Sequence, residues 1–387
     1  MQIKNGGEGV NFLKDTYIDK KTGRTKDRNW KGRKKASLLM SESYKRIGET
    51  SKGVRVGQCG NYLEFKVYSE FERKLKNANF CRCRLCPMCM WRRSRKVYQQ
   101  VAKIMDYLEE QKEYKYIFLT VTFRNMVGDD LPKAIDAFME SFKRMTNSKE
   151  FKKAAKGFFR ALEVRKKYDR EDFHPHIHVI IAVDKRYFEK KDKQSGYMNH
   201  DEWMNLWRRC ANLDYDPWVD IRKVKEKVQK IKNKNGEVEK IKSIKGAVAE
   251  VSKYCTKSTD IIIDVDEVYF YGTKESDKGK YHKTKRGKPN ELYEHFKKEF
   301  EDYADEILPI MDKALKGRRL LSFGGIFKEI HKLLNLDNPE DGDLIHENDD
   351  IPREDLAYIV ETYVWAQGYQ NFIQIHPEGG EENADEV

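Results

Sequence analysis

Two histidines separated by one apolar residue are the strongest candidates for chemistry in the sequence. His176 and His178 lie in HPHIHVIIAV, residues 174–183, whose β-branched residues predict a strand. Side chains at i and i+2 of a strand point to one face, so both imidazoles project together while Ile177 faces the core. Two neighbouring imidazoles can share one cation. His174 has the same parity, but Pro175 at the strand start can turn it away, and we do not expect it to be a ligand.

A third ligand is predicted in the preceding strand. Glu163 lies in GFFRALEVR (157–165), and the charged stretch KKYDREDF (166–173) predicts a hairpin loop that brings Glu163 beside the histidines. Nitrogen and carboxylate ligands with open positions suit Mn²⁺ or Mg²⁺, of which Mn²⁺ tolerates imidazole better, and zinc stays open. The alternative for Glu163 is a surface carboxylate paired with Arg160 or Arg165.

A tyrosine between lysines is the second candidate. The segment KGAVAEVSKYCTK (245–257) predicts a helix that places Glu250, Lys253, Tyr254 and Lys257 on one face. The phenol has a reference pKa near ~10, and nearby cations stabilise its phenolate. It could then attack phosphorus and form a covalent phosphotyrosine, while a carboxylate one turn earlier could activate water. Taken alone, the segment is more typical of an ordinary helix, because the chain has 21 tyrosines.

Five cysteines predict a structural zinc site. Cys81, Cys83, Cys86 and Cys89 form the pattern C-x-C-x2-C-x2-C. Soft thiolates select zinc, but four ligands crowded into nine residues strain one tetrahedral site, so Cys59 upstream is a plausible partner. Reduced, buried thiols without metal are the alternative. The two other cysteines are expected in the core: Cys210 and Cys255.

Charge favours a polyanionic partner. The 387-residue chain has a net charge of +12, with 39% hydrophobic and 36% charged residues, and nucleic acid is the partner that such an excess favours. Directly after the cysteines a basic helix start is predicted to lie along phosphates, the alternative being a solvated face. Its cations are Arg92, Arg93, Arg95 and Lys96. No membrane span or signal peptide is recognisable, which predicts a cytoplasmic protein.

The elements that must position these residues predict an α+β fold. Strands are expected at 114–123, 157–165, 174–183 and 218–224, and helices at 36–48, 91–112, 131–147 and 201–210. Their order suggests a central antiparallel β-sheet covered by helices. The expected divisions are a basic, largely flexible segment (1–53), a cysteine-rich zinc-binding segment and helix (54–112), a domain with the histidine pair and the tyrosine segment (113–275), a helical C-terminal domain (290–375) and an acidic disordered tail (376–387).

Taken together, the chain resembles the HUH endonuclease superfamily. More narrowly it is similar to the rolling-circle replication initiators (Rep) of small Gram-positive plasmids, the type with one catalytic tyrosine. Three motifs match in order, namely FLTVTF (118–123), HPHIHVI (174–180) and EVSKYCTK (250–257), and FCRCRLCPMCMWRRSRK (80–96) is also typical of this family. The resemblance is strong over 54–260 and weaker from 290 to 370.

The resemblance implies a role for each matched residue. His176, His178 and Glu163 would hold the catalytic cation, and Tyr254 would attack a phosphodiester to leave a 5′-phosphotyrosine and a 3′-hydroxyl that primes synthesis. Glu250 would promote terminal hydrolysis. Lys253 and Lys257 would contact the DNA backbone. The zinc ligands implied by the resemblance are Cys59, Cys81, Cys86 and Cys89, with Cys83 as the alternative.

The leading hypothesis is therefore a metal-dependent, origin-specific nicking and joining enzyme that acts on single-stranded or hairpin origin DNA. Its partners by resemblance are a host helicase and DNA polymerase, and an oligomer is compatible with the sequence. Two alternatives stay open: an HUH relaxase or transposase, and a non-catalytic, zinc-stabilised DNA-binding repressor. The cysteine segment and the Glu-x3-Tyr pattern favour the initiator.

Overall fold

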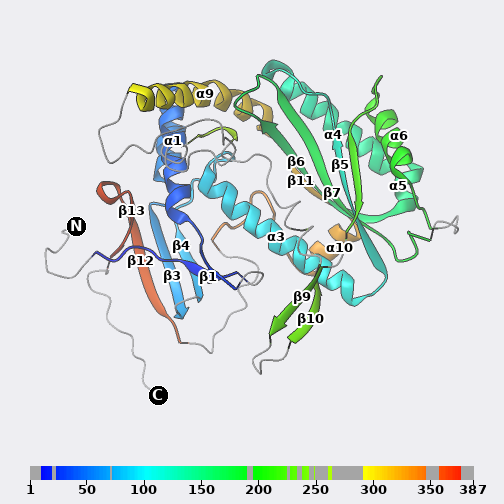
Figure 1. Ribbon diagram of the computed structural model, residues 1–387, viewed down its shortest axis with the longest axis horizontal. Coiled ribbons are helices and arrows are strands. Elements are labelled where there is room, and N and C mark those ends of the chain that lie inside the picture. The colour runs from blue at the N-terminus through cyan, green and yellow to red at the C-terminus, as the bar shows by residue number, and fades with distance from the viewer. Residues whose placement is uncertain are drawn as a thin grey trace.

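The computed structural model describes residues 10–19, 23–69, 72–189, 195–224, 227–232, 238–243, 248, 260–263, 291–345 and 357–375. The fold is α+β with antiparallel sheets, as the sequence predicts. Figure 1 shows two lobes, one around a five-stranded sheet and one around a four-stranded sheet, with helix α3 (Pro87–Glu110) running from one to the other. None of the helices in these ranges is long and apolar enough to cross a membrane.

The five-stranded sheet has the order β11-β6-β7-β5-β8, and every neighbouring pair is antiparallel. Its strands are β5 (Tyr114–Thr122), β6 (Ala155–Lys166), β7 (Phe173–Asp184), β8 (Val219–Lys223) and β11 (Leu321–Gly325). Four of the five lie within a few residues of the predicted strands. The exception is β11, which pairs with β6 on the side away from β7, although about 160 residues separate the two strands in the sequence.

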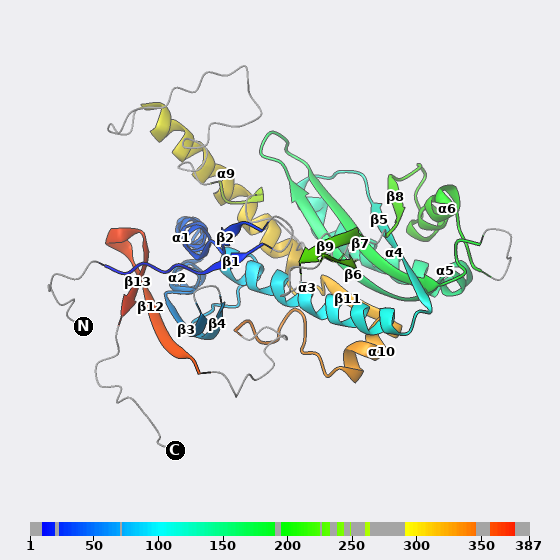
Figure 2. The ribbon, with the colours of Figure 1, turned by 60° about the horizontal axis from the view of Figure 1, so that its bottom comes forward.

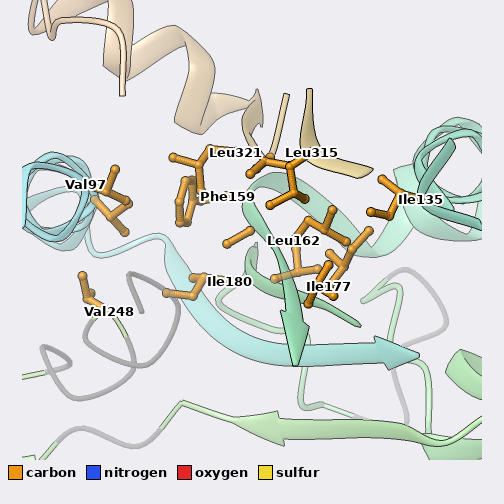
Figure 3. Packing of buried hydrophobic residues seen from close by; sticks show 14 of the residues in the cluster. Val97, Ile135, Phe159, Leu162, Ile177, Ile180, Val248, Leu315 and Leu321 are labelled. Carbon is orange, nitrogen blue, oxygen red and sulfur yellow. The ribbon is translucent and has the colours of Figure 1, made fainter. Parts of the chain in front are cut away.

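Helices cover both faces of this sheet. On one face Phe158 of β6 packs against Phe142 of α4 (Leu131–Asn147) and Phe151 of α5 (Lys149–Ala154). The third helix of this layer is α6 (His200–Ala211), which packs on α4. On the other face lie α3 and α10 (Ile326–Leu333). Figure 3 shows Val97 of α3 and Ile135 of α4 on opposite sides of the sheet residues.

The four-stranded sheet has the order β13-β12-β3-β4. Its strands are β3 (Tyr62–Ser69), β4 (Glu72–Ala78), β12 (Ile359–Ala366) and β13 (Asn371–Ile375). Residues 290–375 are therefore not a purely helical domain, because only α9 (Glu291–Leu315), α10 and the short η3 (Gln367–Tyr369) are helical there. The segment IVETYVWA is rich in β-branched and aromatic residues, and as β12 it pairs with β3 and buries Tyr363.

The expectation of a largely flexible segment at 1–53 is wrong for its second half. Two helices, α1 (Trp30–Arg46) and α2 (Thr50–Gln58), occupy it, and Met40 and Tyr44 of α1 are fully buried. The helix predicted at 36–48 is present as part of α1, which begins earlier; polar residues such as Ser37 on its buried side weaken the apolar periodicity that would have indicated its full length. The short strands β1 (Thr16–Ile18) and β2 (Thr25–Asp27) precede it.

Two further segments complete the chain. The strands β9 (Lys227–Lys232) and β10 (Val238–Ser243) form a two-stranded antiparallel sheet, which Figure 1 shows extending from the body of the molecule. A single helical turn, η1 (Gly128–Asp130), precedes α4. The helix predicted at 245–257 lies outside the described residues except for Val248, which is buried.

Candidate active site

The β6–β7 hairpin brings the three predicted ligands together. Glu163 of β6 pairs in register with His176 of β7, so the two side chains point to the same face, and His178 follows two residues along. The Oε2 atom of Glu163 lies 3.0 Å from Nε2 of His176 and 3.2 Å from Nε2 of His178. The three ligand atoms lie within 4.8 Å of one another. Glu163 is 5% exposed, so it is not a surface carboxylate.

Neighbouring groups orient both imidazoles. Nδ1 of His178 lies 2.9 Å from the hydroxyl of Thr120 on β5, and Nδ1 of His176 lies 3.3 Å from the carbonyl oxygen of His174. A carbonyl oxygen only accepts, so His176 donates its Nδ1 proton there, and in the neutral ring Nε2 carries a lone pair. That lone pair faces a carboxylate oxygen, an arrangement that is favourable only when a cation or an additional proton lies between them.

The distances fit a divalent cation. Adjacent ligand atoms around an octahedral ion at ~2.1 Å are about 3 Å apart, as are the nitrogen and oxygen atoms here. Burial opposes the charge of Glu163, but the adjacent side chains of His176 and His178 outweigh it and hold the pKa of the carboxyl at about 2. Two imidazoles and one carboxylate that is ionised at neutral pH are donors suited to Mn²⁺ or Mg²⁺.

A second carboxylate is tied to the cluster through an arginine. Nη1 of Arg165 lies 3.7 Å from Oε1 of Glu163, and its Nε donates to Asp260 across 2.7 Å. Asp260 is buried, and the hydroxyl of Tyr303 on α9 donates to its backbone carbonyl. Burial raises the pKa of Asp260 above its ordinary value despite Arg165. Nothing in the sequence marks Asp260, because no spacing rule relates it to β6.

The cluster lies in a cleft of about 500 Å³. One wall comes from the β6–β7 hairpin and its loop, the other from β5 and the start of β8. Cations outnumber carboxylates among the lining residues. The charged lining residues are Arg165, Lys167, Arg170, Arg222, Asp172 and Asp220. This cleft can therefore take a phosphodiester beside the predicted ligands.

The predicted tyrosine motif cannot be placed in this geometry. Tyr254, Glu250, Lys253 and Lys257 lie outside the described residues. The described residues on either side of the motif are buried in the same core: Val248 is 1% exposed and Ile261 is 0% exposed. Val248, Val97 and Ile180 belong to one hydrophobic core (Figure 3), and Ile180 lies on the sheet face that carries His178.

Four cysteines meet at the base of α3. Sγ of Cys89 lies 3.5 Å from that of Cys59 and 3.7 Å from that of Cys81, and Cys86 completes the group. Thiolates around tetrahedral zinc at ~2.3 Å are about 3.8 Å apart, so the spacing fits the ion. Cys83 is not in the group, and its sulfur lies 3.3 Å from Arg55.

The prediction that the start of α3 lies along phosphates is wrong for three of its four cations. Arg92, Arg93 and Lys96 are at most 8% exposed. Arg92 donates to the carbonyl oxygens of Leu344 and Ile345, and Lys96 pairs with Asp337. These groups hold the 337–345 segment against α3, because buried cations require partners. Arg95 is partly exposed and lies 5.9 Å from the Trp91 ring.

Comparison with known proteins agrees with the geometry. Residues 72–373 match the family described as "Replication protein". A "Protein rep" of Bacillus amyloliquefaciens is 37% identical over 368 residues, covering 92% of this chain and 97% of that protein. A "Protein rep" of Streptococcus pneumoniae is 34% identical, covering 87% of this chain and 89% of that protein. A "Replication protein" of Staphylococcus aureus is 31% identical, covering 68% and 92%. No solved structure matches.

The match to the family covers well over half of the chain, and two of these relatives align over nearly their whole length. A replication initiator must bind the origin DNA of its plasmid, which accounts for the basic cleft. The chain therefore belongs to the replication protein family, the replication initiators of plasmids of Gram-positive bacteria.

Proposed function

We propose that this chain starts rolling-circle replication by nicking one strand of the plasmid origin through Tyr254. The observation that carries the proposal is the convergence of Glu163, His176 and His178 at a basic cleft. A replication initiator needs no such cluster merely to bind DNA, whereas cleavage of a phosphodiester requires its negative charge to be neutralised. Mn²⁺ or Mg²⁺ in this site would polarise the scissile phosphate.

The chain's own residues would carry the transfer. The phenol oxygen of Tyr254 forms a bond to phosphorus as it loses its proton, and the bond from phosphorus to the 3′ oxygen breaks. The departing oxygen takes up a proton and becomes a 3′-hydroxyl, while the 5′ end stays on the tyrosine. Lys253 and Lys257 stabilise the phenolate and hold the DNA backbone. The 3′-hydroxyl can attack the phosphotyrosine in the reverse direction, which rejoins the strand.

Chain connectivity is compatible with this role. Asp260, which pairs with Arg165 beside the cluster, follows Tyr254 by six residues. Six residues span at most about 20 Å, a length that allows Tyr254 to reach the cleft from Asp260. Glu250 would serve a later step, in which it takes a proton from water so that hydrolysis releases the enzyme when replication ends.

The other expected components follow from the same proposal. Zinc held by Cys59, Cys81, Cys86 and Cys89 would fix the start of α3. A host helicase would unwind the duplex ahead of the 3′ end, and a host DNA polymerase would extend it. The family match favours this function over a relaxase or transposase. A non-catalytic repressor stays the competing function from a different class.

Covalent capture of DNA tests the proposal. The protein would be incubated with 5′- and 3′-labelled single-stranded oligonucleotides that tile the origin of its plasmid, in Mn²⁺, and run on a denaturing gel. A protein-linked band from the 3′-labelled strand, lost with EDTA and in Tyr254→Phe, is expected. Tyr369→Phe is the matched control, because Tyr369 is exposed in the other lobe. A band that survives in Tyr254→Phe would exclude this nucleophile, and DNA binding without cleavage by the wild type would favour the repressor.

A further inference from the structure

One tryptophan at the cleft stands apart from the others. The chain has six tryptophans, and Trp218 alone among them is exposed, with 63% of its surface accessible. Three of the others, Trp30, Trp203 and Trp207, are at most 3% exposed. A large aromatic side chain in water forgoes the burial that usually stabilises it, so its exposure at a cleft favours a binding role.

The sheet aligns Trp218 with the predicted metal ligands. Val219 of β8 pairs with Val121 of β5, which puts Trp218 opposite Thr122, and Thr122 in turn pairs with His176. The hydroxyl of Thr122 donates to the carbonyl oxygen of Trp218 across 2.9 Å. Directly opposed residues of antiparallel strands point to one face. Trp218 and His176 are thus two strand spacings apart, about 10 Å, and both line the cleft.

The segment that carries Trp218 is fastened at a second point. The hydroxyl of Tyr215 accepts a hydrogen bond of 3.0 Å from the backbone of Arg124, and the Arg124 guanidinium lies 3.7 Å from the centre of the Tyr215 ring. Pro217 directly before Trp218 is buried and fixes its own backbone angle. Trp218 is therefore held at the mouth of the cleft rather than carried on a free loop, which lowers the entropic cost of binding there.

The charge beside Trp218 is suited to a DNA backbone. On the opposite wall Lys167 forms no ion pair with any described residue, while Arg170, three residues further along the same loop, pairs with Asp172. An exposed aromatic face beside cations binds single-stranded nucleic acid well, because the base stacks while the cations hold phosphates. Bases within a duplex are already stacked on each other and cannot use this surface.

We propose that Trp218 is the stacking platform for an unpaired base next to the scissile phosphate. It is a specificity-determining residue, which makes the cleft select single-stranded DNA over duplex. This deepens the function proposed above and rests on the same site. It does not depend on Tyr254, because stacking requires no bond to break.

The test compares two single-stranded probes of equal charge. One is a fluorescein-labelled 12-mer of thymidines and the other a 12-mer of abasic residues, and binding is measured by anisotropy in EDTA. Stacking on one base is worth roughly 5- to 150-fold in affinity, so the wild type is expected to prefer the thymidine probe by such a factor. Trp218→Ala should lose most of this preference, and Trp218→Phe should retain most of it.

The matched control is Tyr369→Ala, since Tyr369 is an exposed aromatic residue of the four-stranded lobe. It should bind both probes as the wild type does. Binding of the thymidine probe should also quench the tryptophan fluorescence of the wild type. The quenching should be much weaker in Trp218→Phe. A preference unchanged in Trp218→Ala would overturn the proposal, even if the wild type nicks DNA. A preference lost in Trp218→Ala would support it even if no nicking occurs, in which case only the nicking function fails.

Discussion

At the scale of the residue, the site depends on a carboxylate that faces two imidazoles. Oε2 of Glu163 lies 3.0 Å from Nε2 of His176 and 3.2 Å from Nε2 of His178, and its Oε1 lies 3.7 Å from Arg165. The substitution Glu163→Gln keeps the shape but removes the charge. We expect Mn²⁺ affinity to fall at least about 10-fold and nicking to fall with it, while the fold is retained. Titration calorimetry with Mn²⁺ measures the first effect and the denaturing gel the second.

A surface glutamate gives the control for this variant. Glu140 on α4 forms only an exposed pair with Lys143, so Glu140→Gln should bind Mn²⁺ as the wild type does. Unchanged Mn²⁺ affinity in Glu163→Gln would rule out Glu163 as a ligand.

Two cysteines that sequence spacing cannot separate should respond differently to substitution. Cys86 belongs to the group of four thiols, whereas Cys83 lies beside Arg55. We expect Cys86→Ser to lower the zinc content of the purified protein and its melting temperature, because the tetrahedral site loses a ligand. Cys83→Ser should retain one zinc per chain. Atomic absorption measures the zinc content of both variants. Loss of zinc in Cys83→Ser but not in Cys86→Ser would mean that Cys83, and not Cys86, is the ligand.

At the scale of the element, the sequence predicts best where periodicity and burial agree. Helix α4 begins and ends at the predicted residues, and β5, β6 and β7 differ from prediction by at most three residues at either end. The pairing of Glu163 with His176 was also foreseeable, because a short charged loop between two strands implies a hairpin. Two neighbouring strands thus suffice to predict the candidate metal site.

Long-range contacts explain what the sequence could not predict. The cations at the start of α3 are adjacent to a cysteine segment and have the composition of a DNA-binding helix, but 337–345 covers them. Their partners are mostly backbone carbonyl oxygens, which no sequence pattern reveals. The contact of Arg165 with Asp260 and the alignment of Trp218 with His176 likewise arise from tertiary structure alone.

The structural role of these cations predicts a stability effect without a DNA effect. Lys96 pairs with Asp337 and donates to the carbonyl oxygen of Asp343. Burial opposes the charge of Asp337, but the hydrogen bond from Lys96 outweighs it and lowers its pKa. Lys96→Met should cost about 1–2 kcal/mol of unfolding free energy, since partly exposed Asp337 can regain water. The slope of DNA affinity against salt should stay unchanged.

The pH dependence of that cost has a definite sign. A carboxyl whose pKa is lowered by folding adds stability above its unfolded pKa of ~3.9, and the gain is lost as pH falls below it. The difference between wild type and Lys96→Met should therefore shrink between about pH 5 and pH 3. Urea unfolding at several pH values measures it. If Lys96→Met instead lowered the slope of DNA affinity against salt concentration by about one and left the free energy of unfolding unchanged, Lys96 would be a phosphate contact.

At the scale of the whole molecule, the two ends of the chain close one lobe. β12 lies between β13 and β3, so the last described strands complete a sheet begun near residue 62. Figure 2 shows β12 and β13 beside α1, β3 and β4, with α3 leading away toward the five-stranded sheet. Cys59, a predicted zinc ligand, lies three residues before the first residue of β3, so the C-terminal strands support the lobe that holds the predicted zinc site.

This arrangement predicts that a chain ended after residue 356 cannot form the four-stranded lobe. It would lack β12 and β13, leaving β3 unpaired along one side and exposing Leu63 and Phe65, which are at most 1% exposed in the full chain. Unpaired strands with apolar faces aggregate, so the truncated chain should elute as large species on gel filtration and be cut by trypsin before residue 87. A chain ended after residue 375 keeps every described strand pairing and is the matched control, expected to stay intact. A monodisperse, trypsin-resistant 1–356 chain would contradict the coupling between the two ends.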